Sequence, residues 1–174
     1  MNKKQHTLNA TIQLQGVGLH TGESVKVTIE PAAENYGYKF QRTDIEGEPI
    51  IPADADLVVS TERGTTLEKK GVKVNTTEHL LAALYGMQVD NALIKLDGAE
   101  IPIMDGSALP FVEAIETIGL KEQKADRDYF EFQENRPFED LEKGVEMLGI
   151  PYDDFRLTVM VDYDSPVLGT QHAS

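Results

Sequence analysis

Apolar and polar residues alternate along two stretches near the N-terminus of the chain. Every second residue is apolar over residues 8–14 and again over residues 25–29, and a glycine-rich segment separates the two runs. A period of two is typical of strands that bury one face. The pattern therefore predicts a β-hairpin that ends at Pro31, and the same period predicts further strands over residues 36–40 and 92–96.

Two segments between these strands carry a helical pattern. Residues 75–86 have a candidate capping residue at Asn75 or Thr76, good helix formers in the middle and a glycine at the end. The second helix is predicted to follow Ser107, which we expect to be its N-cap, and to end at Gly119. Strands with two inserted helices indicate an α+β fold in which a sheet layer packs on helices.

The density of negative charge rises near Asp126. From that residue to the end of the sequence there are 4 basic and 12 acidic residues, against 12 and 18 before it. The polar residues 119–128 follow the second helix and precede a strand-like segment over residues 129–132. We therefore place a domain boundary here, with a complete α+β domain over residues 1–126 and the start of a second domain over residues 127–174.

The segment after the boundary predicts an unfinished sheet. Residues 144–150 and 155–161 predict a pair of strands joined by a turn. Little chain follows that could cover their apolar face, and a two-stranded hairpin alone is marginally stable. We therefore expect the second domain to be truncated at residue 174.

Composition narrows the range of partners. Thirty acidic residues against 16 basic ones give a formal net charge of -14 and a pI near 4.6, so no general attraction to nucleic acid or to an anionic bilayer is expected. Forty per cent of the residues are hydrophobic, but no apolar run approaches the roughly 18 residues of a transmembrane helix. The N-terminus lacks the apolar stretch of a secretory signal, so we expect a soluble, cytoplasmic protein. Cysteine is absent, which restricts metal ligands to His, Asp and Glu.

Residues 16–22 hold three glycines and a histidine, which invites comparison with a dinucleotide-binding loop. Thr21 stands at the sixth position, and the last glycine comes one residue late. A strand pattern follows directly, whereas a dinucleotide loop leads into a helix. The glycines are therefore expected to form a tight hairpin connection. His20 is the residue of this turn with chemistry, and both a solvated ring and a role at a site are consistent with its place.

Glu78 and His79 lie in the first turn of the first predicted helix. The helix dipole there favours a carboxylate and disfavours an imidazolium, which suits a general base and a neutral metal ligand. Adjacent helical side chains point about 100° apart, as a base and a ligand that serve one water molecule need. Two structural alternatives stay open: Glu78 as the partner of Asn75 in a capping box, and His79 as a partly buried histidine bonded to a backbone carbonyl.

The histidine count limits any metal site. A catalytic zinc ion normally has three protein ligands, and the chain has histidines at positions 6, 20, 79 and 172. No two of them have helical ligand spacing, and the residues four places after the first three are Ala10, Ser24 and Ala83. If His79 binds a catalytic zinc ion, its helical partner ligands lie outside this chain.

Four segments together resemble a known family. They occur in the family's order, with family-like gaps, and together they span most of residues 5–120. The segments are Gly16-Val-Gly-Leu-His-Thr-Gly22, Thr76-Thr-Glu-His-Leu-Leu-Ala-Ala-Leu84, Asp90-Asn91 and Ile101-Pro-Ile-Met-Asp-Gly-Ser-Ala-Leu-Pro-Phe-Val112. On these segments the chain resembles the UDP-3-O-acyl-N-acetylglucosamine deacetylases, the zinc hydrolases that commit material to lipid A in Gram-negative bacteria.

The resemblance implies two similar α+β domains, each a sheet layer packed on helices, with zinc and an acylated UDP-sugar substrate between them. By match to the family's motifs, His79 is a zinc ligand and Glu78 is the general base for the water that attacks the acetamide carbonyl. His20, Thr61 and Glu62 are implied to border the substrate.

The family's two further zinc ligands, a His and an Asp one helical turn apart, belong to the second domain. His172 does not match either of them, so we expect the isolated chain to be inactive until the rest of the second domain completes the site. Some proteins of the family are fused to a hydroxyacyl-carrier-protein dehydratase, and the parent of this chain could be such a fusion. The alternative is a natural short chain of the same fold that binds a partner or a sugar nucleotide without hydrolysing it.

Overall fold

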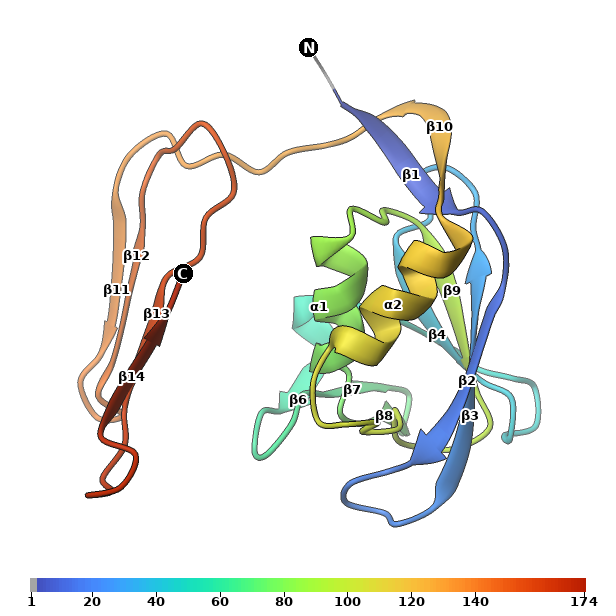
Figure 1. Cartoon of the computed structure of the whole chain (residues 1–174), viewed down its shortest axis with the longest axis horizontal. Coiled ribbons are helices and arrows are strands. Elements are labelled where there is room, and N and C mark those ends of the chain that lie inside the picture. The colour runs from blue at the N-terminus through green and yellow to red at the C-terminus, as the bar shows by residue number, and fades with distance from the viewer. Residues whose placement is uncertain (1–2) are drawn as a thin grey trace. The chain divides into compact units, whose positions relative to one another are not determined.

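The computed structural model describes residues 3–174, a chain of mixed α+β structure that forms two compact units (Figure 1). The first unit extends to Arg127, and the second unit is Asp128–Ser174. All α-helical residues belong to the first unit, and the second unit consists of strands and connections.

The first unit is built around a five-stranded sheet. Across the sheet the strands are β2 (Ile12–Val17), β3 (Ser24–Pro31), β9 (Ala92–Leu96), β4 (Tyr38–Arg42) and β5 (Ile50–Pro52). β4 and β9 run parallel, and the other neighbouring pairs are antiparallel. Alternate residues of β3 and β9 are buried, which is the pattern expected of strands with one face in the core.

Two α-helices lie on one face of this sheet (Figure 1). They are α1 (Glu78–Gly86) and α2 (Leu109–Ile118), and they contact each other. Leu80 and Leu84 of α1 join Phe111 and Ile115 of α2 in one fully buried cluster with the inward side chains of the sheet. This core fixes the start of α1 relative to the strands. Neither helix has the length and apolar character of a membrane span, and the same holds throughout residues 3–174.

Two smaller sheets complete the first unit. One pairs β1 (Lys4–Leu8) with β10 (Leu120–Asp126), antiparallel. The other follows a 3-10 helix at Ala55–Leu57 and contains β6 (Val58–Ser60), β7 (Thr66–Lys69) and β8 (Val72–Val74). The connection between β6 and β7, residues 61–65, supplies one wall of the candidate site described below.

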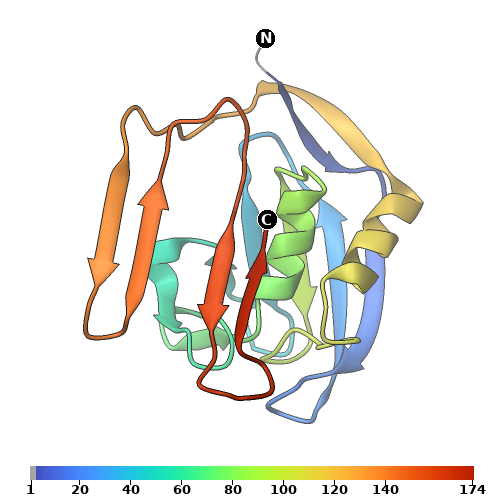
Figure 2. The same ribbon diagram turned by 60° about the vertical axis from the view of Figure 1, so that its left-hand side comes forward.

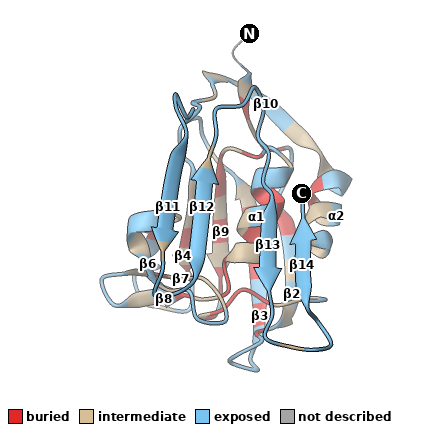
Figure 3. Cartoon of the chain, turned by 90° about the vertical axis from the view of Figure 1, so that its left-hand side faces the viewer, coloured by how far each residue is buried: buried red, intermediate tan, exposed pale blue. Residues whose placement is uncertain are grey.

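The second unit consists of two antiparallel hairpins, visible as separate pairs of arrows in Figure 2. β11 (Arg136–Asp140) pairs with β12 (Val145–Gly149), and β13 (Val159–Asp162) pairs with β14 (Thr170–Ala173). Nearly all of their residues are exposed (Figure 3). Many large apolar side chains of the second unit are among the exposed ones. The hairpins therefore do not build a core of their own.

Several predicted elements of the first unit are confirmed. β3 ends at Pro31, β9 covers residues 92–96, and both helices end at their predicted glycines. Gly119 has a φ of +71°, and Gly22 in the connection between β2 and β3 has a φ of +68°. This left-handed region favours glycine, which explains why the chain turns at these two positions.

The predicted hairpin over residues 8–29 is wrong at its beginning. A bend at Asn9 and Ala10 splits the first apolar run, so its two halves enter different sheets as β1 and β2. The Asn9 amide donates to the carbonyl of Gly119 at 3.0 Å, beside the start of β10. The polar residues 119–128, expected to be a connection, contain this strand, whose exposed charged residues concealed its character.

The predicted pairing within the second unit is also wrong. The segments 144–150 and 155–161 do contain strands, but these strands pair with other neighbours rather than with each other. Each pairs across a turn that contains a left-handed glycine, Gly144 or Gly169, with φ of +63° and +54°. Residues 129–132, expected to be strand-like, form no strand.

Candidate active site

The helix α1 begins at Glu78, one or two residues later than a cap at Asn75 or Thr76 predicted. Thr77, directly before the helix, is the N-cap, so neither Asn75 nor Thr76 has that position. The Thr77 side chain makes no capping hydrogen bond. The backbone of Asn75 instead forms a bridge with residues 99–101. Its amide donates to the carbonyl of Ala99 at 2.8 Å, and its carbonyl accepts from the amide of Ile101 at 3.1 Å.

The Glu78 carboxylate binds a neighbouring loop. Its Oε2 accepts a hydrogen bond of 2.8 Å from the backbone amide of Thr65, in the connection between β6 and β7. The amide and the hydroxyl of Thr77 both donate to the carbonyl of Thr65 at 3.2 Å. The capping box of Asn75 and Glu78 is therefore wrong, because the carboxylate reaches across to the loop rather than back to its own helix terminus.

His79 lies beside this carboxylate. Its Nε2 is 3.8 Å from Oε1 of Glu78, and the two side chains are 29% and 37% exposed, respectively. The tips of the side chains thus lie closer together than the divergence of adjacent helical residues predicted. Among residues 3–174 no backbone carbonyl accepts a hydrogen bond from the His79 ring, contrary to the second alternative. Both functional groups are open to solvent while their backbone is held in the helix.

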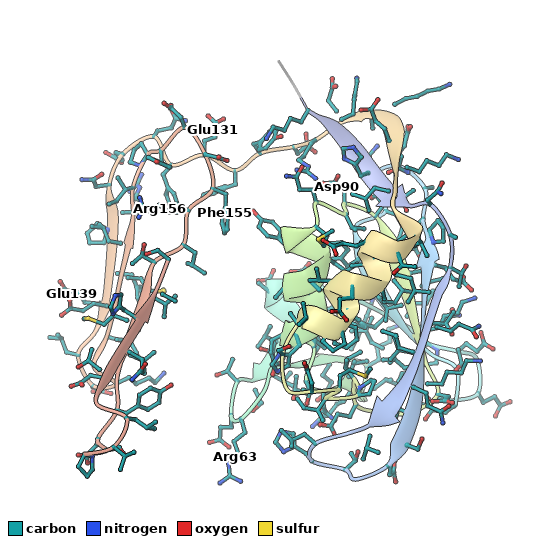
Figure 4. All side chains as sticks on the ribbon, in the orientation of Figure 1. Arg63, Asp90, Glu131, Glu139, Phe155 and Arg156 are labelled. Carbon is teal, nitrogen blue, oxygen red and sulfur yellow. The ribbon has the colours of Figure 1, made fainter. Side chains whose placement is uncertain are left out.

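His20 lies in the connection between β2 and β3, and its ring reaches the β6–β7 connection. Its Nε2 is 3.0 Å from the carbonyl oxygen of Arg63. His20, Glu62 and Arg63 line an open hollow of about 510 Å³, and Figure 4 shows Arg63 at the tip of its loop. Thr61 is exposed in the same loop but does not line the hollow. Gly64 follows Arg63 in this loop, and a Cβ placed on it would lie 3.4 Å from Oε1 of Glu78. The loop that borders the hollow therefore also contacts the Glu78 carboxylate.

The buried carboxylate of Glu100 connects the β2–β3 connection with the residues directly before α1. Glu100 is 0% exposed. Its Oε1 accepts from the hydroxyl of Thr76 at 2.8 Å and from the His20 amide at 3.1 Å, and its Oε2 accepts from the amides of Thr21 at 2.9 Å and His20 at 3.2 Å. Burial alone would raise the pKa of Glu100, but the hydrogen bonds from Thr21, His20 and Thr76 outweigh it and hold the pKa below its ordinary value of 4.5.

The connection between β2 and β3 has a glycine, Gly18, at the point where the Glu100 carboxylate approaches the backbone. A Cβ on Gly18 would lie 2.5 Å from Oε2 of Glu100 and 2.3 Å from Oγ1 of Thr21. The backbone of Gly18 closes the turn, since its amide donates to the carbonyl of Glu23 at 2.9 Å and its carbonyl accepts from Gly22 at 3.0 Å. The loop is a hairpin connection, as predicted, and close approach rather than a left-handed backbone requires this glycine.

The turn before α2 is held by Asp105. Its Oδ1 accepts from the amide of Ser107 at 2.9 Å and from the Ser107 hydroxyl at 2.8 Å. These hydrogen bonds from Ser107 lower the pKa of Asp105. Ser107 accepts from the amide of Leu109 at 3.1 Å, but the N-cap position itself belongs to Ala108. The predicted cap is therefore displaced by one residue.

The other two histidines lie elsewhere. His6 belongs to β1, where its buried Nδ1 makes no hydrogen bond, and His172 belongs to β14 of the second unit. In the part of the chain that the structure describes, no three His, Asp or Glu side chains are grouped so that they could hold a metal ion. An imidazole in the first turn of a helix suits a zinc ligand, so His79 fits as a single candidate ligand, and a complete zinc site would need donors from outside these residues.

Comparison with known proteins decides the family. The family model described as "LpxC: UDP-3-O-acyl N-acetylglycosamine deacetylase" matches residues 5–174. The chain belongs to this family. A bifunctional enzyme LpxC/FabZ of Chlorobaculum tepidum is 50% identical over 97% of this chain and 36% of its own length. A UDP-3-O-acyl-N-acetylglucosamine deacetylase of Hahella chejuensis is 44% identical over 95% of this chain and 54% of its own length. The chain thus spans between about a third and about half of the length of these LpxC relatives.

The sequence reasoning missed two residues that organise the site of this LpxC chain. Glu100 and Thr76 are both buried and bonded to each other, yet Glu100 was given no role and Thr76 was expected only as a candidate cap of the first helix. The available signal was a glutamate directly before the apolar residues 101–104. A charged residue in an apolar segment is rarely buried unless hydrogen bonds or an opposite charge stabilise it.

Proposed function

We propose that this chain is the N-terminal part of a zinc-dependent deacetylase that removes the N-acetyl group from a UDP-3-O-acyl-N-acetylglucosamine. Its family membership and the names of its relatives support this activity. The observation that carries the proposal is the meeting of Glu78 and His79 at the start of α1, with the loop that borders the His20 hollow against the same carboxylate.

We further propose that residues 1–126 are the first domain of this enzyme and residues 127–174 the opening of the second. The length of the relatives supports this division, because the chain accounts for only 36–54% of them. The exposed apolar side chains of the second unit support it too, since a finished domain would bury them. The most exposed of them are Phe130, Leu141, Met160 and Val167.

His79 is the zinc ligand that this chain contributes, and two further ligands are supplied by the remainder of the second domain. Zinc, when bound, supplies the positive charge that polarises the acetamide carbonyl and the attacking water. The exposure of the His79 ring to solvent is compatible with such binding. The isolated chain is therefore inactive, because one ligand does not hold a catalytic zinc ion tightly.

Glu78 is the general base. Its Oε2 is oriented by the Thr65 amide, and its Oε1 faces His79, so the carboxylate is fixed beside the reacting water and takes its proton. Attack of that water on the acetamide carbonyl forms the new C–O bond, and transfer of the proton to the departing nitrogen lets the C–N bond break, which leaves acetate and the free amine. His20, Thr61 and Glu62 border the substrate, and Arg63 adds a cation at the same hollow that suits an anionic sugar nucleotide.

The proposal is tested in the full-length protein with Glu78→Gln and His79→Ala. The amide oxygen that Glu78→Gln introduces can still accept from Thr65, so this substitution removes the base and keeps the loop contact. We expect acetate release to fall by about 10²–10⁴-fold, the usual contribution of a general base, with zinc content unchanged. His79→Ala is expected to lose the zinc as well. Glu68→Gln is the matched control, because Glu68 pairs with Lys73 on β7 and β8 at 3.4 Å and is not among the site residues.

One observation favours a non-catalytic alternative, in which the protein binds a sugar nucleotide without hydrolysing it: residues 3–174 contain no group of three His, Asp or Glu side chains that could hold a metal ion. The same experiment separates the two functions. Acetate release by the wild-type protein that is lost in Glu78→Gln supports the deacetylase. Substrate binding without acetate release, or full turnover in Glu78→Gln, contradicts it.

A further inference from the structure

Glu100 has no part in the proposed chemistry, yet it is the most completely enclosed carboxylate near the site. It is 0% exposed, so it does not touch the substrate. Burial of a charge is unfavourable unless hydrogen bonds or an opposite charge compensate it. Among residues 3–174 no Lys or Arg forms an ion pair with it, and the hydrogen bonds from Thr76, His20 and Thr21 carry that compensation.

These hydrogen bonds join two segments that are far apart in the sequence. The amides of His20 and Thr21 belong to the connection between β2 and β3, whereas Thr76 lies two residues before Glu78. Thr76 has a φ of +57°, so a strained backbone position is held in place directly before α1. The distance between the His20 ring and the Glu78 carboxylate therefore depends on the Glu100 side chain.

The contacts form a closed circuit around the site. His20 reaches the carbonyl of Arg63, and Thr65, two residues further on, donates to Glu78. Thr76 lies two residues before Glu78, and its hydroxyl donates to the Glu100 carboxylate. The same carboxylate accepts from the His20 amide, which completes the circuit. Glu100 is the side chain that closes this circuit on its buried side.

We propose that Glu100 is a positioning residue, which sets the location of His20 relative to Glu78 and His79. This inference rests on the proposed function, because it gives those three residues their roles. A carboxylate is suited to the task, since its two oxygens accept from all of these donors, whereas a glutamine offers one acceptor oxygen and directs an NH₂ donor at other donors. Glu100→Gln therefore breaks the circuit with almost no change in side-chain volume.

The first test is a double-mutant cycle in the full-length, zinc-loaded protein. We expect Glu100→Gln to lower kcat/KM by about 10–100-fold, as small misplacements of site residues do, with zinc content unchanged. In a His20→Ala background the same substitution should change kcat/KM by less than about threefold, because the group that Glu100 positions is gone. An equal loss in both backgrounds overturns the proposal, as does full activity of Glu100→Gln.

A second pair of variants covers the case in which Glu100→Gln does not fold. Thr76→Val removes one donor to Glu100 and keeps the shape of the side chain, whereas Thr76→Ser keeps the hydroxyl. We expect Thr76→Val to lose activity about tenfold, through loss of a charged hydrogen bond, and Thr76→Ser to retain most of it. Equal activity of the two variants contradicts the proposal. Glu30→Gln is the neutral control, because Glu30 pairs with Lys95 on the strands β3 and β9.

Amide hydrogen exchange separates a failure of this inference from a failure of the proposed function. In Glu100→Gln, or in Thr76→Val if that is the variant that folds, the amides of His20 and Thr21 should exchange faster while that of Val27 in β3 is unchanged. Unchanged exchange at His20 and Thr21 overturns the positioning role even if the protein is a deacetylase. Full turnover in Glu78→Gln contradicts the function instead, whatever the exchange shows.

Discussion

Gly18→Ala adds one methyl group at the most crowded point of the site. The new Cβ would lie 2.3 Å from Oγ1 of Thr21 and 2.5 Å from Oε2 of Glu100. Both separations are at least 1 Å shorter than the roughly 3.5–4.0 Å of a favourable contact between non-bonded atoms. The φ of Gly18 is outside the left-handed region, so crowding rather than backbone strain determines the effect.

The loss of stability in Gly18→Ala depends on which neighbouring atoms have to move. The Thr21 hydroxyl can rotate away, but the Glu100 carboxylate shifts only by loosening its hydrogen bonds to Thr21 and His20. Overpacking of this kind costs about 1–3 kcal/mol, and a weakened hydrogen bond to a charged group belongs to the same range. We expect Gly18→Ala to lower the free energy of unfolding of the first unit by about 2–3 kcal/mol.

The measurement is urea unfolding at pH 7, followed by the NMR amide signals of Val27 and Ile94 in the core strands. Gly86→Ala is the matched control, because nothing lies within 4 Å of a Cβ at Gly86 and this residue ends α1. Alanine there is expected to stabilise by about 0.5–1 kcal/mol through the unfolded chain. If Gly18→Ala unfolds within about 0.5 kcal/mol of the wild type, which is the usual range for surface changes, the reasoning about close approach is refuted.

Two further predictions concern buried polar side chains. Asn91 is 1% exposed and joins three segments, since its Oδ1 accepts from Gly37 at 2.9 Å and its Nδ2 donates to Gln5 at 2.9 Å and Gln123 at 2.8 Å. Asn91→Ala should therefore cost about 2–4 kcal/mol, with faster amide exchange in β10, and unchanged urea midpoints would contradict this. The pKa of Glu100 is lowered in the folded state, so its contribution to stability is present above about pH 4.5 and is lost as the pH falls through the folded pKa. The difference in unfolding free energy between wild type and Glu100→Gln should accordingly be constant near neutral pH and shrink below about pH 4.5, and a difference that grows on acidification would show the sign to be wrong.

Local pattern was sufficient for the elements whose signal lies within a few residues. Alternation identified β3 and β9, and Pro31 marked the end of β3 because proline donates no ladder hydrogen bond. Gly119 marked the end of α2 because its left-handed φ suits glycine. The pairing of β1 with β10 escaped this reasoning, because these strands are more than a hundred residues apart and the charged residues of β10 disguise its period.

By itself the sequence determined the residues with chemistry at the start of α1 and the resemblance of their surroundings to a deacetylase. It did not determine what these residues bind, since capping by Asn75 and contact with Thr65 are equally compatible with the local sequence around Glu78. Only the tertiary structure brought Thr65 to Glu78 and Glu100 to His20 and Thr76. The physical reason is that periodicity and capping depend on near neighbours in the chain, whereas the donors that satisfy a buried carboxylate are supplied by whichever segments the core packs beside it.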